Sequence, residues 1–315
     1  MHQFPAAAAL TLAATAVAAG QTTHEASVEA EATLLGLPPI GAPAPEDPPR
    51  PYRTIRDVSV SVGADYVTKY ISRGIVFSNE PSVQPWLELR FALTEPDDDD
   101  PHLTWRIGTW NSMQGADAGE GRPRGTRERR LRHWYEFDLY TGLQVDFFDH
   151  FQTSFMFYYY SSPSGAFDDI HELEWRLNYD DQWVWEQELG LEGFALYPAM
   201  RITAETRHPE RGGAWYFQPS ITPSYTLQDA PVDLTVSVPV ILGFGANEMY
   251  LDEDGENIYL GMIQSGLRLS TPIDLGDGDL SIRGGLDVTY VTDSNINGFG
   301  NDVEFVGRLG VTYNF

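Results

Sequence analysis

The sequence predicts an all-β fold, a transmembrane antiparallel up-and-down β-barrel of about 12 strands, within a range of about 10 to 14. The C-terminal segment gives the first observation. Every odd position from Val303 to Phe315 is apolar, aromatic or glycine, and Glu304 and Arg308 lie between them. Because successive side chains of a strand point to opposite faces, this pattern indicates a strand with one apolar and one polar face. Similar segments recur along the chain, and the connectors between them alternate in length.

The composition restricts the possible partners. The 46 Asp and Glu residues outnumber the 20 Lys and Arg residues, which argues against nucleic acid because phosphate binding needs a basic surface. The absence of cysteine excludes disulfides and thiolate metal sites. Tyr, Phe and Trp make up 13% of the chain, and Tyr and Trp are favoured where a membrane meets water. We expect neither a cofactor nor a metal.

The first 56 residues predict an export signal and a linker. An Ala-rich run over 6–19, followed by Gly20, fits a secretory signal at 1–20, although only His2 offers a positive charge before it. Residues 21–56 are rich in Ala, Glu and Pro, which predicts a disordered periplasmic linker before a barrel at 57–315. No later stretch reaches the ~20 apolar residues of a spanning helix, but a barrel strand needs only ~9–11 residues.

The alternating segments give the predicted strands. In Trp134–Val145, for example, Tyr135, Leu139 and Leu143 share one face and Glu136, Asp138 and Gln144 share the other. The predicted strands are Val58–Lys69, Val83–Leu93, Leu103–Trp110, Trp134–Val145, Phe151–Tyr160, Glu172–Tyr179, Tyr197–Glu205, Trp215–Leu227, Val232–Phe244, Tyr259–Ser270, Leu280–Tyr290 and Val303–Phe315.

The connectors favour the outer-membrane arrangement, with short turns on the periplasmic side and longer loops outside. With a periplasmic C-terminus, the outward loops are Val76–Ser82, Asn111–Arg132, Ser161–Asp169, Thr206–Gly213, Ala246–Asn257 and Thr292–Asn301. The inward turns include Asp146–His150, Gln228–Pro231 and Thr271–Asp279. One inward connector, Asp180–Ala195, is long and predicts either a further strand or a short interfacial helix.

A soluble β-sandwich is the main alternative, because its strands also alternate. Sandwich strands average about 5–6 residues, however, whereas many of these segments are about twice as long. The barrel is therefore the favoured fold.

The face opposite the apolar one would line the lumen, and arginine is its main cation. Its charged residues could close the lumen with salt bridges, or they could line a channel for small polar solutes. We predict as lumen-lining residues Glu88, Arg90, Arg106, Glu136, Asp138, Glu174, Arg176, Arg201, Arg268, Arg283, Asp287 and Arg308, together with Glu172, Glu205, Asp233 and Glu304.

Two loops carry concentrated charge. The basic segment Arg122–Arg132 could meet lipopolysaccharide phosphates, although a solvated loop is the simpler interpretation. The segment Asp252–Asn257 resembles part of a calcium loop but lacks the full spacing and the closing bidentate Glu, so an acidic turn is favoured.

We predict no catalytic residues. The chain has no Gly-x-Ser-x-Gly and no His-Glu-x-x-His, and His133, His150 and His171 lie at predicted strand ends. A lipid-modifying barrel enzyme could still assemble its residues from separate strands, so it stays the less favoured alternative.

The first hairpin resembles a known family. The stretch from Asp65 to Leu89 contains a Tyr-bearing strand, an Arg-Gly pair and then Pro and Gln entering the second strand, here Tyr66, Arg73, Gly74, Pro81 and Gln84. It is similar to the opening of the TorF-like porins, the Gcw_chp-type bacterial outer-membrane barrels. The resemblance implies an outer-membrane barrel with a porin role. Read from the residues, Gly74 would allow a bend at the rim and Arg73 would pair inside the barrel.

These observations predict a bacterial outer-membrane barrel that passes small polar solutes through a narrow, charged lumen. A closed structural or surface-interaction barrel is the alternative. The expected partners are outer-membrane lipid, the solutes, and the barrel-assembly machinery, which would read Tyr313 and Phe315 in the last strand.

Overall fold

The strands form a closed barrel. The computed structural model describes residues 58–94, 101–115, 131–209, 211–227, 233–275, 278–298 and 300–315. Twelve antiparallel strands, each paired with its neighbours in the sequence, close when β1 pairs with β17 from Ser61–Asn314 to Val67–Arg308. The predicted all-β up-and-down barrel is confirmed. The predicted signal at 1–20 and linker at 21–56 lie outside the described residues.

The wall follows the predicted strands closely. Its first half consists of β1 (Val58–Val67), β4 (Ser82–Ala92), β5 (His102–Gln114), β6 (Trp134–Phe147), β7 (Phe151–Ser161) and β8 (Ile170–Tyr179). Its second half consists of β10 (Ala199–Arg207), β11 (Trp215–Ile221) with β12 (Ser224–Leu227), β13 (Leu234–Ser237) with β14 (Val240–Ala246), β15 (Leu260–Asp274), β16 (Asp279–Val291) and β17 (Val303–Asn314).

Two predicted strands are interrupted. The breaks fall at Pro223, between β11 and β12, and at Pro239, between β13 and β14. Proline has no N–H to donate to a neighbouring strand, so the hydrogen-bond ladder loses a donor at each of these positions. Both halves of each broken strand remain in the wall, and β15 pairs with both β13 and β14.

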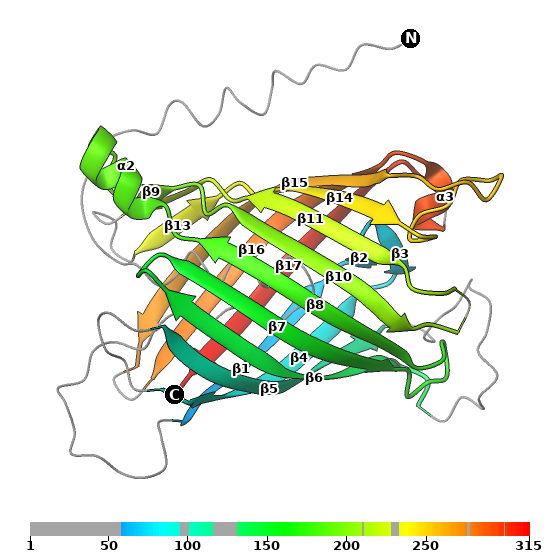
Figure 1. The fold of residues 1–315 in the computed structure, drawn as a ribbon, viewed down its shortest axis with the longest axis horizontal. Helices are drawn as coiled ribbons and strands as arrows, with labels where there is room; N and C mark the ends of the chain where they lie inside the picture. Colours follow the sequence, from blue (N-terminus) through cyan, green and yellow to red (C-terminus); the bar gives the residue numbers. More distant parts are fainter. Residues whose placement is uncertain are drawn as a thin grey trace.

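The two ends of the barrel differ (Figure 1). One end, here called the turn end, holds the C-terminus, the 148–150 turn, the short helix α2 (Gln182–Leu189) and β9 (Phe194–Ala195). The other, the loop end, holds the hairpin β2 (Tyr70–Ser72) and β3 (Ile75–Ser78) and the short helix α3 (Ser294–Asn297). The long 180–195 connector thus contains both of its predicted forms, the short helix α2 and the two-residue strand β9, which pairs with β12. Among the described helices, none is long and apolar enough to cross a membrane.

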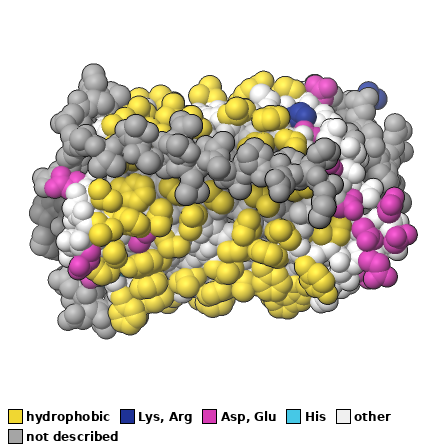
Figure 2. Space-filling model, turned by 90° about the horizontal axis from the view of Figure 1, so that it is seen from above, with side chains coloured by type: hydrophobic (Ala, Val, Ile, Leu, Met, Phe, Trp, Pro, Cys, Tyr) yellow, Lys and Arg dark blue, Asp and Glu magenta, His cyan; other side chains and the backbone are white. Residues whose placement is uncertain are grey.

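The outer surface of the barrel is apolar. Along β17 the odd-numbered Phe305 and Leu309 are each 59% exposed. Glu304, on the inner face of the same strand, is only 4% exposed. Phe155, Leu173, Leu267 and Leu286 are likewise exposed on other strands. Figure 2 shows hydrophobic side chains spread over the barrel, with acidic side chains toward its ends. An apolar exterior of this kind suits a lipid environment rather than water.

The β1–β4 connector is not the outward loop predicted at Val76–Ser82. Residues 70–78 instead form an antiparallel hairpin whose aromatic side chains pack on Trp86 and Trp110, which face the lumen. The sequence analysis did not predict this hairpin, because Tyr70, Val76 and Phe77 resemble residues at the end of an ordinary barrel strand.

Tyr135 is a second correction. Its predicted partners on the outer face, Leu139 and Leu143, are exposed, but Tyr135 is only 3% exposed and packs inside. The pairing of β5 and β6 shifts by one residue here, from Ser112–Glu136 to Met113–Trp134. Such a bulge breaks the two-residue period and lets one extra side chain turn inward.

Candidate functional site: the barrel lumen

Buried polar and charged side chains line the lumen. Most of the predicted lining residues lie in the interior. Their exposed fractions are below 8% for Glu88, Arg106, Glu136, Asp138, Glu172, Glu174, Arg176, Arg201, Glu205, Arg268, Arg283, Asp287 and Glu304. Arg90 and Arg308 retain side-chain exposures of 13% and 11%, and Asp233 is partly exposed beside β13. The lining residues lie close enough to shield one another from water.

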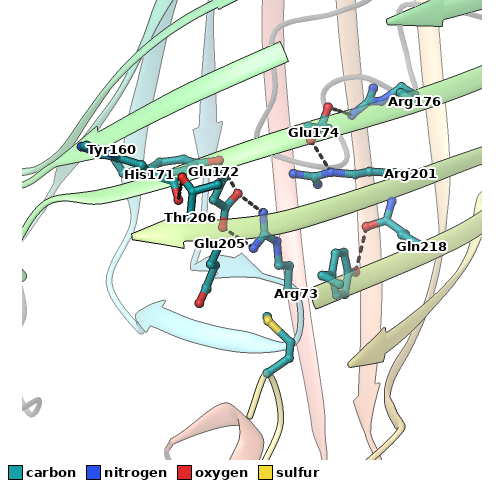
Figure 3. Close-up of polar contacts among 12 residues, drawn as sticks. Arg73, Tyr160, His171, Glu172, Glu174, Arg176, Arg201, Glu205, Thr206 and Gln218 are labelled. Carbon is teal, nitrogen blue, oxygen red and sulfur yellow. Dashed lines mark hydrogen bonds and ion pairs between the residues drawn. The ribbon is translucent and has the colours of Figure 1, made fainter. Parts of the chain in front are cut away.

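Three arginine–carboxylate–arginine triads organise the wall. In the first, the two oxygens of Glu88 accept from Arg90 Nε at 2.6 Å and Arg106 Nη2 at 2.7 Å. In the second, shown in Figure 3, Glu174 lies between Arg201 Nε at 2.5 Å and Arg176 Nη2 at 3.4 Å. Each carboxylate is therefore shared by two guanidinium groups, which is the charge-assisted geometry that favours arginine over lysine.

The third triad lies on the last three strands, β15, β16 and β17. Asp287 on β16 accepts from Arg268 Nη2 at 2.8 Å and Arg308 Nε at 2.7 Å, which come from the two flanking strands β15 and β17. A simple pair adjoins it, in which Arg283 Nη2 donates to Asp65 Oδ2 at 3.0 Å. This pair spans β17, because Asp65 lies on β1 and Arg283 lies on β16.

Glycines make room for these charged groups. Directly across the strand pairs, Gly108 faces Glu88, Gly142 faces Arg106, Gly266 faces Asp287, Gly285 faces Arg268 and Gly310 faces Asp65. A Cβ atom added at Gly266 or Gly310 would overlap the carboxylate of Asp287 or Asp65. The missing side chains at Gly266, Gly285 and Gly310 therefore leave space for the ion pairs, whereas those at Gly108 and Gly142 leave space for Tyr140 and Met156.

The hairpin tip crosses the lumen and joins β8. Arg73 donates through both Nη atoms to the two oxygens of Glu172 at 2.6 Å, and the Tyr160 hydroxyl donates to Glu172 at 2.9 Å (Figure 3). The Arg73 guanidinium also lies 5.0 Å from the ring centre of Tyr216. The sequence-based expectation that Arg73 pairs inside the barrel agrees with this placement.

The hairpin body packs against two walls. On one side Tyr70 and Phe77 contact a cluster of Trp86, Trp110 and Tyr135. On the other side Ile75 packs on the cluster that contains Ala214, Tyr216, Ile241, Met249, Tyr250, Met262, Val291 and Ile296. The hairpin thus spans the loop-end mouth of the lumen as a packed element.

Two further carboxylates lie beneath the hairpin. The Tyr70 hydroxyl donates to Glu136 at 3.0 Å. Asp138, two residues further on the same face of β6, has a buried Oδ1 with no hydrogen-bond partner among the described residues. The mouth therefore has an acidic side, in contrast to the arginine-rich wall below it.

Burial shifts the pKa values of two hairpin groups. Burial, reinforced by Glu136, raises the pKa of Tyr70 well above its ordinary value, so the hydroxyl keeps its proton and donates. Burial opposes the charge on Arg73, but the attraction of Glu172 outweighs it and the pKa of Arg73 is raised. The tip therefore stays cationic.

The residues of the first-hairpin motif have separate positions. Tyr66 lies on the outer surface with 46% exposure, whereas Gln84 is buried and donates to Ser82 at 3.2 Å. Pro81 precedes β4, and Arg73 and Gly74 form the hairpin tip with φ of 52° and 79°. An Arg-Gly pair with both φ values positive fits a two-residue hairpin turn, and this is the signal that could have revealed the hairpin.

The remaining predicted features take no part in the lumen. Tyr313 and Phe315 pack together at the turn end, with ring centres 5.4 Å apart. In the 252–257 turn, Asp252 accepts from the backbone N–H groups of Asp254 and Glu256, as an acidic turn does. The basic segment Arg122–Arg132 lies outside the described residues except for its last two positions.

No protein-family model and no curated protein matches the chain. Among solved structures, it is similar to the COG4313 outer membrane channel from Pseudomonas putida F1, with 12% identity, a TM-score of 0.45 and coverage of 86% of this chain and 100% of that chain. It is also similar to LpxR from Salmonella typhimurium, with 8% identity, a TM-score of 0.43 and coverage of 81% and 99%. At these identities and TM-scores the likeness carries no functional argument, and the TorF-like resemblance stays a prediction.

Proposed function

We propose that this protein is a bacterial outer-membrane porin that passes small polar solutes through a narrow lumen. One observation carries the proposal: the barrel is apolar outside, yet its inner wall carries charged side chains from Glu304 near the loop end to Arg90 near the turn end. A polar interior continuous between both ends is what a hydrated path for polar solutes requires.

The apolar exterior supports the membrane location. Exposed leucine and phenylalanine side chains on successive strands would be costly in water but stable against lipid. Closed barrels leave no unpaired strand edge, which allows them to span a bilayer.

The hairpin makes the proposed path narrow. It occupies the loop-end mouth and is fixed at its tip by the Arg73–Glu172 pair. The single-channel conductance is therefore expected to be small. It should increase if the hairpin moves away from the wall.

A closed barrel is the second candidate, and the burial of the lining favours it. Glu88 is fully buried, and both of its carboxylate oxygens accept hydrogen bonds from arginines of the wall rather than from water. In this alternative the salt bridges fill the lumen and the loops carry out the function.

Planar-bilayer recording distinguishes the two candidates. Protein refolded in detergent, with its folding checked by heat-modifiable gel mobility, is expected to give small, discrete channel events. Liposomes containing it should also release small sugars faster than protein-free liposomes. Folded protein that gives neither channel events nor solute release would contradict the porin proposal and leave the closed barrel.

A further inference from the structure

We propose that the pore selects small anions over small cations. This inference rests on the proposed porin function and adds the substrate class to it. It is carried by the composition of the three triads and by their position on the wall below the hairpin.

The triads and the adjoining pair together carry an excess of positive charge. Each triad brings two arginines and one carboxylate, and the remaining pair brings one of each. The arginines thus outnumber the carboxylates by three in the set Arg90, Arg106, Arg176, Arg201, Arg268, Arg283, Arg308, Asp65, Glu88, Glu174 and Asp287.

The excess charge is distributed around the wall. The first triad lies on β4 and β5, the second on β8 and β10, and the third on β15, β16 and β17. A solute passing along the lumen therefore meets cationic groups from several sides, rather than a single patch that it could avoid.

One guanidinium keeps a donor that could bind an anion. Arg201 Nη1 is buried and has no acceptor among the described residues, although Nε of the same side chain donates to Glu174. The hydroxyl of Thr203, two residues along the same face of β10, is also buried without a partner among them. Two unused donors on one face favour an acceptor such as chloride, phosphate or a carboxylate.

The acidic groups at the rims oppose this preference but do not reverse it. Glu136 and Asp138 lie at the loop end under the hairpin, and Asp146 and Asp233 lie near the turn end. The other mouth carboxylates, Glu172, Glu205 and Glu304, are each paired with Arg73, Arg211 or Lys69. Glu136, Asp138 and Asp146 all lie on β6, whereas the triads present arginines from several strands around the wall. The arginine-rich wall is therefore expected to set the selectivity.

The expected preference is measurable. A unit charge in contact with an ion in water changes its local concentration by about fivefold, and a drier lumen increases this effect. The chloride-to-potassium permeability ratio should therefore be about fivefold or more at low salt, and it should fall as salt screens the wall.

Reversal potentials in a KCl gradient test the inference. The triple variant R90Q/R176Q/R308Q removes one arginine from each triad and leaves each carboxylate its other partner. It should lose most of the anion preference while retaining channel events. The variant E136Q/D138N, which removes the two carboxyl groups at the mouth, should not reduce the preference.

A control for the single variants removes one arginine charge outside the triads. Arg207 is exposed at the loop-end tip of β10, so R207Q should leave the reversal potential nearly unchanged. All variants should first show heat-modifiable mobility equal to that of the original chain. A triple variant that fails this check is replaced by the three single variants, each of which should reduce the preference in part.

The outcomes separate the two proposals. If the folded protein gives no channel events, the porin function itself fails. If it conducts but prefers potassium, or if the triple variant leaves the reversal potential unchanged, the anion inference is wrong and the porin function stands.

Discussion

At the residue scale, most charged side chains of the lumen are paired with a side chain of opposite charge. The Arg73–Glu172 pair illustrates this, because both guanidinium Nη atoms bond the two carboxylate oxygens and little of either side chain is exposed. Two charges buried in this way tolerate joint replacement far better than the loss of one member. The energetic consequence can be measured by a double-mutant cycle.

We predict that Arg73→Ala lowers the free energy of unfolding by about 3 kcal/mol, because it leaves the Glu172 carboxylate buried without its cation. Adding Glu172→Gln should restore much of that loss, since a neutral amide needs no counter-charge. Urea unfolding in lipid vesicles measures both values. A loss in the double variant equal to the sum of the Arg73→Ala and Glu172→Gln losses would show that the pair is not coupled.

The glycines opposite the charged residues allow a second test at this scale. Gly310→Ala should destabilise the barrel by about 1–3 kcal/mol, because the new methyl group overlaps Asp65 and crowds Arg283. The control is Gly284→Ala on β16, where the nearest atoms lie 3.7 Å from the added Cβ in ordinary contact. The same unfolding assay applies, and equal effects at the two glycines would contradict the explanation.

At the element scale, the hairpin β2–β3 is separate from the wall that surrounds it. Its strands pair only with each other, and its side chains pack on both lumen walls. Its turn depends on Arg73 and Gly74, which both have positive φ. A glycine adopts this conformation without strain, whereas a β-branched residue does not.

We predict that Gly74→Val displaces the hairpin and leaves the wall intact. The positive φ costs a β-branched residue about 1–2 kcal/mol, and the new side chain would also crowd Val291 and Met262. Limited proteolysis should therefore cut within 70–78 faster, while the heat-modifiable mobility stays unchanged. Gly212→Val is the control, because nothing lies within 4 Å of a Cβ at Gly212. A cleavage rate within 70–78 that is the same in Gly74→Val as in the original chain would contradict the prediction that the substitution displaces the hairpin.

The elements also show which features the sequence could predict. All the wall strands follow from the two-residue alternation, since lipid outside and polar groups inside impose the same period on each strand. The breaks at Pro223 and Pro239 also have a local cause in the sequence. The inward hairpin and the bulge at Tyr135 do not, because they depend on contacts with Trp86, Trp110 and Glu172, which are distant in the sequence.

The charged lining was predictable by type but not by pairing. Alternation identifies which residues face inward, and it correctly separates Glu304 and Arg308 from Phe305 and Leu309. It does not show which carboxylate meets which arginine, because a one-residue change of register would create other pairs. The triads depend on the register of the strand pairs, which the alternation does not determine.

At the scale of the whole molecule, the barrel has an apolar exterior and a polar, arginine-rich interior. Tryptophans lie on both sides of this boundary. Trp105 and Trp215 are 39% and 41% exposed on the outside, whereas Trp86 and Trp110 are nearly fully buried inside. The two pairs should therefore differ in their contact with lipid.

We predict that brominated lipid chains quench the fluorescence of Trp105 and Trp215 and leave that of Trp86 and Trp110 nearly unchanged. Variants that keep a single tryptophan, with the others replaced by phenylalanine, allow each position to be measured in vesicles. Equal quenching at all four positions would contradict the assignment of inner and outer faces.

The central claim is that the polar lumen is a solute path narrowed by the hairpin. The most direct test compares single-channel conductance of the full chain with that of a variant in which 70–78 is replaced by a Gly-Ser segment of equal length. Both proteins must first show the same heat-modifiable mobility. The claim predicts small events for the full chain and clearly larger events for the variant. Absence of conductance in both folded proteins would contradict it.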